Sequence, residues 1–171
     1  MSYIHIEIFT VDHIVRGLVN TDGERLTDVL NKRTISSVVL KDVEIVRLAR
    51  VGKEAPLRLD NACIEKNAIL FAKPVEQDLT QKSMFRKTTR QLFQITVLIN
   101  NFELRGRIHL AERLNISKIL LLRPEDFIPI TDARASYVWN PAISFPSDMI
   151  VFNKTKVTLL GENYPKPPEA K

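Results

Sequence analysis

The chain has 171 residues, of which 44% are hydrophobic and 26% are charged, and its net charge is +5. This composition is typical of a folded globular protein and excludes wholesale disorder, and the length suits one medium domain or two small ones. The single cysteine, Cys63, excludes an intrachain disulfide and a cysteine-based metal cluster, which fits a reducing compartment. We see no signal-peptide pattern and no apolar run of the ~20 residues that span a bilayer, so we expect a cytoplasmic protein.

The first third of the chain reads as two strands followed by a helix. Isoleucines alternate with polar residues over 4–8 and predict a strand, and a second strand is expected over 14–19. Gly17 interrupts this second strand, and a glycine inside a strand marks a bulge or a bend. Thr21 and Glu24 have the spacing of a capping box, which predicts a short helix over about 24–32.

The elements that follow complete one unit and then start again. We expect one long bent strand or two strands over 38–48, a loop over 51–61 and a closing pair of strands over 63–72. The polar connection 75–94 could be a helix or an extended linker. The second unit follows the same plan, and its expected elements are strands over 95–99 and 102–109, a helical or mixed stretch over 112–122, a long strand over 127–138, a loop over 140–148 and a closing pair over 149–160.

Matching residues recur at an almost constant distance along the chain. Val15-Arg16-Gly17 corresponds to Leu104-Arg105-Gly106 at an offset of 89, Arg25 corresponds to Arg113 at 88, and Asp42 corresponds to Asp132 at 90. Such a period indicates one structural unit used twice. We therefore predict a mainly β protein: a tandem duplication of a small five-stranded barrel, each barrel with one short helix.

The predicted boundaries follow from the repeat. The first barrel covers 1–74, the linker 75–94 and the second barrel 95–161, and the proline-rich residues 162–171 are expected to form a disordered tail.

The order of elements in each unit resembles a small barrel of the Sm-like or SH3-like kind. Sm-like proteins that bind RNA carry an Asp-x-x-x-Asn loop after the glycine strand and an Arg-Gly pair between the closing strands. Here the first loop reads Asp22-Gly23-Glu24-Arg25-Leu26, and the closing turns hold Glu65-Lys66-Asn67 and Asn153-Lys154-Thr155. The resemblance therefore supports the barrel and weakens an RNA-binding interpretation.

A second resemblance rests on a short motif. Arg25-Leu26-Thr27-Asp28-Val29-Leu30-Asn31, followed by a strand that ends in Leu40-Lys41-Asp42, resembles an uncharacterised bacterial domain family with an R-L-x-D-x-L-N run. The second unit departs from this pattern, because Arg113-Leu114 is followed by Asn115-Ile116-Ser117. This resemblance implies no chemistry.

Basic residues form the first candidate binding feature. A polyanion could be bound by four residues of the linker and by the arginines of the two Arg-Gly pairs: Lys82, Arg86, Lys87, Arg90, Arg16 and Arg105. The alternative is structural. The four linker residues would then form a solvated face. Gly17 and Gly106 would let the strands bend while each arginine faces water or pairs with a carboxylate, with Asp42 and Asp132 as candidates.

Aromatic residues form the second candidate. Tyr137 and Trp139 follow the long strand of the second unit beside Pro141, where they could bind a protein or plug the end of the barrel. None of the histidines has a second ligand at metal spacing, and we find no nucleophile motif and no phosphate-binding glycine loop. We expect no metal, no cofactor and no catalytic residues.

The function expected from these patterns is a non-catalytic interaction or assembly module that binds a protein through loops or strand edges, with a homo-oligomer as one form of it. The alternative is nucleic-acid binding through the basic linker and the Arg-Gly pairs. An enzyme would require Asp42, Asp132, Arg25 and Arg113 to meet between the two barrels.

Overall fold

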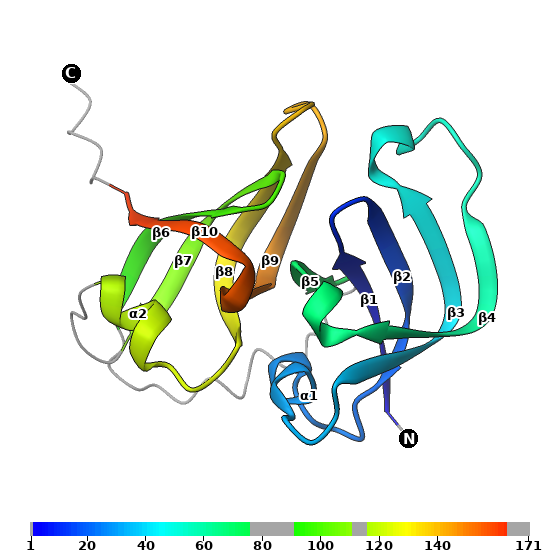
Figure 1. Ribbon diagram of the computed structural model, residues 1–171, viewed down its shortest axis with the longest axis horizontal. Coiled ribbons are helices and arrows are strands. Elements are labelled where there is room, and N and C mark those ends of the chain that lie inside the picture. Colours follow the sequence, from blue (N-terminus) through cyan, green and yellow to red (C-terminus); the bar gives the residue numbers. More distant parts are fainter. Residues whose placement is uncertain (1, 76–90, 111–115, 164–171) are drawn as a thin grey trace.

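The computed structural model describes residues 2–75, 91–110 and 116–163, and this part of the chain is mainly β (Figure 1). The N-terminal half contains β1 Tyr3–Phe9, β2 His13–Asn20, α1 Leu26–Asn31, β3 Ser37–Arg47, the 3-10 turn Leu48–Arg50, β4 Leu57–Glu65, the 3-10 turn Lys66–Ala68 and β5 Phe71–Pro74. The C-terminal half contains β6 Gln91–Ile99, β7 Phe102–Leu110, α2 Ile116–Leu122, β8 Phe127–Tyr137, β9 Ser144–Asn153, the 3-10 turn Lys154–Lys156 and β10 Val157–Glu162.

The ten strands of the described segments form one antiparallel sheet with the order β10-β6-β7-β8-β9-β5-β1-β2-β3-β4. Figure 1 shows the two halves side by side, with β5 and β9 between them. The mainly β prediction is confirmed, but the prediction of two closed barrels is not. β5 pairs with β1 on one side and with β9 on the other, so its second edge is taken by the other half. The sheet is therefore open, and β4 and β10 are its edge strands.

Each half bends its sheet at a glycine. The β2–β3 register shifts between Arg16 and Leu18, and across from this point Asp42 has a φ of 50°. The β7–β8 register shifts between Arg105 and Arg107, across from Asp132, which has a φ of 47°. Short polar side chains such as aspartate tolerate this left-handed backbone better than most residues. Gly17 and Gly106 thus lie at bulges, where the sequence predicts a bulge or a bend.

The strand registers of the two halves correspond pair by pair. Ile6 lies opposite Gly17 in β1–β2, as Ile95 lies opposite Gly106 in β6–β7. The same agreement holds for the outer strands, where Glu7 faces Lys73 and Thr96 faces Gly161. The offset between corresponding residues stays between 88 and 90.

The hydrophobic core is shared across the joint between the halves. One buried cluster combines residues of β6–β9 with Phe9 and Phe71 of the N-terminal half. The other combines β1–β3 with Phe127 and Val151 of the C-terminal half. At the joint the Phe9 and Phe71 rings stack with centroids 4.3 Å apart, and Phe102 meets Phe71 edge-on at 4.9 Å. The halves therefore bury apolar surface against each other, which thin five-stranded cores need.

Hydrogen bonds fix the register of the joint. In β5–β9, Phe71 lies opposite Phe152 and Ala72 opposite Val151, and the amide of Asn153 donates to the carbonyl of Leu70 at 2.8 Å. Farther along, the last residue of α1 reaches the first residue of β8. The Asn31 amide nitrogen donates to the Phe127 carbonyl and its oxygen accepts from the Phe127 amide, both at 2.9 Å.

We predict that Asn31→Ala weakens this joint. The substitution leaves the amide and carbonyl of the buried Phe127 without their partner, so the free energy of unfolding should fall by about 1–2 kcal/mol in a urea titration. Asn67→Ala, an exposed change in the turn before β5, is the matched control and should have little effect. Equal stability of the two variants would show that the Asn31 contacts contribute nothing.

Several predicted boundaries require correction. β6 begins at Gln91, so the linker predicted over 75–94 ends earlier, and its residues 76–90 lie outside the described part of the chain. β4 begins at Leu57 and β9 at Ser144, inside the two predicted loops. The capping box is wrong, because the Thr21 hydroxyl donates to the Ser2 carbonyl and α1 starts without a side-chain cap. The predicted tail begins within β10, and its residues 164–171 are also outside the described part.

Candidate interaction surfaces at the sheet edges

The β4 edge presents apolar side chains to solvent. Within the described residues, β4 pairs only with β3. Leu57 is 60% exposed, and Val39 of β3, which lies opposite the exposed Cys63, is 61% exposed. A nine-residue edge strand with exposed apolar groups is a template for pairing with another chain.

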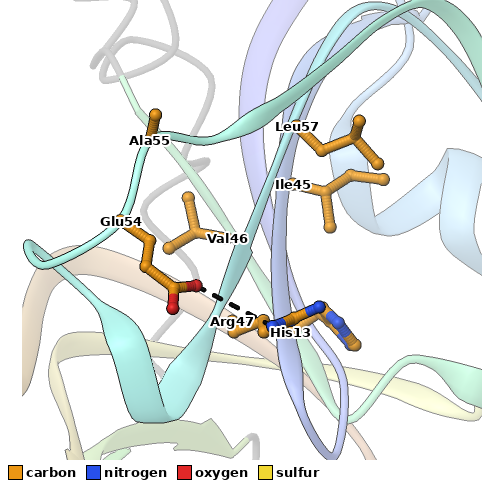
Figure 2. Close-up of a pocket in the computed structure, with 7 residues that line it drawn as sticks. All are labelled: His13, Ile45, Val46, Arg47, Glu54, Ala55 and Leu57. Atoms are coloured by element: carbon orange, nitrogen blue, oxygen red, sulfur yellow. Dashed lines mark ion pairs between the residues drawn. The ribbon is translucent and has the colours of Figure 1, made fainter.

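A shallow pocket of ≈ 240 Å³ lies where β4 begins (Figure 2). Its lining comes from the start of β2, the end of β3, the loop before β4 and the first residue of β4: His13, Ile45, Val46, Arg47, Glu54, Ala55 and Leu57. Figure 2 shows Glu54 reaching toward Arg47, and their charged atoms are 3.9 Å apart. Leu57 and Ile45 belong both to this pocket and to the β4 edge, so the pocket extends the apolar surface of that edge.

The β10 edge carries a second apolar surface. Within the described residues, β10 pairs only with β6, and its Leu159 is 49% exposed. α2 contacts β10 and presents Leu121 and Leu122, which are 79% and 67% exposed. Adjacent exposed leucines on a short helix are unusual for a surface that faces only water, and they indicate a contact surface.

The most buried charge of the described chain lies between the two edges. Glu7 on β1 is 7% exposed and bridges the neighbouring strands. Its Oε1 accepts from Arg16 Nε at 2.7 Å and its Oε2 lies 2.7 Å from Lys73 Nζ. Burial raises the pKa of Glu7, but the hydrogen bonds and charges of Lys73 and Arg16 outweigh burial and lower its pKa below the ordinary value. Nothing local in the sequence predicts this cluster except a charged residue between Ile6 and Ile8.

A lysine closes the helix in each half. Lys66 Nζ donates to the carbonyls of Val29 and Lys32 at the end of α1, and Lys154 Nζ donates to the carbonyl of Arg123 after α2. Burial, together with the nearby charge of Lys32, lowers the pKa of Lys66. These lysines anchor the closing turns to the helices, so their amines are occupied by backbone carbonyls.

We predict that Lys66→Met loosens α1 from the turn before β5. The methionine keeps the length of the side chain but cannot donate to the two carbonyls, so the unfolding free energy should fall by about 1–2 kcal/mol in urea at pH 7. Lys53→Met, an exposed change, should be neutral. A loss as large for Lys53 as for Lys66 would contradict the anchoring role.

Of the predicted polyanion-binding residues, the structure describes only Arg16 and Arg105, and each of these pairs with a glutamate. Arg16 is held by Glu7, and Arg105 Nε lies 2.5 Å from Glu103 Oε1. The proposed pairing with Asp42 and Asp132 is therefore wrong for both arginines, since Asp132 pairs with Arg107 at 3.0 Å. Glu7 lies directly opposite Arg16 across β1–β2, and Glu103 lies two residues before Arg105 on the same strand, so each arginine has a carboxylate nearer than the expected aspartate. The other predicted positions, Lys82, Arg86, Lys87, Arg90 and also Arg113, lie outside the described residues.

Tyr137 and Trp139 separate in the structure. Tyr137 is half-buried, and its ring packs against Phe102 with centroids 5.5 Å apart. Trp139 is 75% exposed in the turn between β8 and β9. Tyr137 thus belongs to the margin of the core, and of the two residues only Trp139 is exposed.

The two aspartates that an enzyme between the halves would require lie far apart in the sheet. Asp42 lies on β3 and Asp132 on β8, and four strands lie between these two in the sheet. Arg25 immediately precedes α1. No group of three histidine, cysteine, aspartate or glutamate side chains in the described segments could hold a metal ion. None of the described helices is long and apolar enough to cross a membrane.

Comparison with known proteins gave no match: no family model, no curated protein and no solved structure is significantly similar to this chain. The resemblance of 25–42 to an R-L-x-D-x-L-N family therefore stays a prediction. The functional proposal below therefore rests on the geometry of the β4 and β10 edges.

Proposed function

We propose that this chain is a duplicated small β unit that works as a non-catalytic assembly module, binding a protein partner through its sheet edges. The observation that supports this most is the β4 edge, where Leu57, Val39 and Cys63 are exposed beside strand backbone that pairs on one side only within the described residues. Burying such side chains contributes about 25 cal/mol per Å² of apolar surface, and the strand backbone gives register.

The features shared by the two halves also favour assembly over catalysis. The glycine bulges, the left-handed aspartates and the lysine anchors all shape or hold the fold. An active site would instead need an acid, a base or a nucleophile in mutual reach.

The proposal is tested by charging the β4 edge. The tagged protein and a Val39→Lys/Leu57→Lys variant are each expressed in the native host, and the copurifying complexes are weighed and identified by mass spectrometry. We expect a specific protein complex for the unaltered chain and its loss in the variant. Val11→Lys, a 43% exposed change in the turn between β1 and β2, is the control and should retain the complex.

Nucleic-acid binding is the competing outcome. Affinity for a mixed-sequence oligonucleotide is measured at two salt concentrations. Micromolar or tighter binding that weakens steeply with salt, together with a complex unaffected by the β4 substitutions, would overturn the assembly proposal.

A further inference from the structure

We infer that the partner of the β4 edge is a second copy of this chain, whose β10 edge pairs with it antiparallel. The inference rests on the proposed function and names its partner. It comes from the joint inside the molecule, where β5 pairs with β9. The two edge strands correspond to these two paired strands, so each molecule carries both sides of a second joint at opposite ends of its sheet.

The correspondence of β10 with β5 is set by their pairing with the neighbouring strand. In β1–β5, Phe9 lies opposite Phe71 and Ile8 opposite Ala72. In β10–β6, Leu98 lies opposite Leu159 and Val97 opposite Leu160. Leu159 and Leu160 therefore occupy the places of Phe71 and Ala72.

The correspondence of β4 with β9 is equally direct. In β8–β9, Ile128 lies opposite Phe152 and Pro129 opposite Val151. In β3–β4, Val38 lies opposite Ile64 and Val39 opposite Cys63. If the intermolecular joint copies the internal one, Leu159 faces Ile64 of the next copy and Leu160 faces its Cys63.

The residues of the internal β5–β9 joint are buried, whereas the corresponding residues of the β10 and β4 edges are not. Phe71, Ala72, Val151 and Phe152 are all 0% exposed. The corresponding residues of the two edges keep apolar character but lie open: Leu159 and Cys63 are exposed, and Leu160 and Ile64 are half-buried. Apolar residues at these four positions fit a surface that is covered in an assembly.

Two further contacts extend the match beyond the strands. Phe145 of β9 packs on Phe9 at 4.8 Å, and the corresponding residues are Leu57, 60% exposed, and Leu98, half-buried. At the helix, α2 corresponds to α1, whose last residue Asn31 binds the first residue of β8. The last turn of α2, which carries the 79% exposed Leu121, would thus lie near the start of β3 in the next copy. Leucines at this end of the helix would make an apolar contact where Asn31 makes two hydrogen bonds.

Such a joint is heterologous, because it brings two different surfaces together. Repeating it adds copies head to tail and gives a ring where the rotation closes or a filament where it does not. Both forms satisfy the inference.

The register is tested with a thiol. Leu160→Cys is introduced into the chain, whose only other cysteine is the exposed Cys63, and the purified protein is oxidised. We expect covalent ladders of two or more chains, joined between positions 160 and 63 in peptide mapping. The ladders should vanish in Leu160→Cys/Cys63→Ser. Asn140→Cys, an exposed change in the turn after β8, should give far fewer of them.

The assembly itself is tested by mass. The unaltered chain is measured over a range of concentrations by light scattering and native mass spectrometry, and complexes of more than one chain are expected. Leu121→Glu should raise the dissociation constant about tenfold or more, because a leucine contact is lost and a charge is placed in the joint. Trp139→Glu, at a similarly exposed position outside the joint, should leave it unchanged.

A chain that stays monomeric at every concentration, with no more ladder from position 160 than from position 140, overturns the inference. The proposed function survives that result if the Val39→Lys/Leu57→Lys variant still loses a complex with a different protein. Both fail if the variant and the unaltered chain bind the same proteins equally.

Discussion

Replacing Glu7 by glutamine should lower the free energy of unfolding at pH 7 by about 3 kcal/mol, because breaking a buried ion pair leaves charge without compensation. The Lys73 side chain is 13% exposed and would keep its charge in a largely buried position. Arg16, 32% exposed, would lose the carboxylate that holds it across β1 and β2. Urea unfolding of the two proteins measures the difference. We expect Glu44→Gln, whose partner Arg58 is 77% exposed, to cost less than about 1 kcal/mol.

The Glu7 effect should depend on pH in one direction. The pKa of Glu7 is lower in the folded chain than its ordinary value of 4.5, so the unfolded chain binds the proton more readily. The stability that the carboxylate contributes is therefore fully present above about pH 4.5 and is lost as the pH falls through the folded pKa. The difference in the free energy of unfolding between the unaltered chain and Glu7→Gln should therefore become smaller below pH 4.5. A difference in unfolding free energy that does not change with pH would contradict the role of the cluster. So would a loss of stability for Glu7→Gln that is no larger than the loss for Glu44→Gln.

Replacing Gly17 or Gly106 by alanine should lower the free energy of unfolding by about 2–3 kcal/mol. Replacing a glycine by alanine usually stabilises a protein where the backbone conformation and the surrounding space allow it. A Cβ at Gly17 would lie 3.0 Å from the Lys41 carbonyl oxygen and 3.2 Å from Leu40 Cβ. At Gly106 it would lie 3.1 Å from the Thr131 carbonyl oxygen. Backbone oxygens of a neighbouring strand cannot move without distorting the bulge, so the sheet must open.

Gly161→Ala is the matched control, because its Cβ would meet nothing closer than Leu159 Cδ2 at 3.7 Å. We expect the unfolding free energy of this variant to stay within about 0.5 kcal/mol of the unaltered chain. Alanine variants at positions 17 and 106 that are as stable as the one at position 161 would show that the bulges do not require glycine.

Most of the strands could be predicted from local sequence patterns. Alternation of isoleucines located β1, and Gly17 and Gly106 located the bulges. β4 was placed too late because Gly52 and Pro56 indicated a loop over 51–61, although Leu57 and Leu59 alternate with Arg58 and Asp60. Residues 57–61 are all exposed on this edge strand, so they lack the buried apolar row by which a half-buried strand is usually recognised in sequence.

The candidate site was less accessible to sequence reasoning. Glu7, Arg16 and Lys73 form one cluster because β1 pairs with β2 on one side and β5 on the other, and nothing local links Glu7 to a lysine on β5. Arg16 was recognised as notable, but Asp42 and not Glu7 was its candidate partner. Leu121 and Leu159 were not singled out, since exposure is a property of the folded chain.

The sequence alone determined that this chain is built mainly of strands, where its glycines bend them, and that its two halves follow the same order, because these features depend on neighbours along the chain. Only the tertiary structure decided that the halves join edge to edge through β5 and β9 instead of closing separately. That choice depends on which distant edge buries Phe71, Ala72, Val151 and Phe152 best, and hydrophobic burial is non-directional, so no short segment records it.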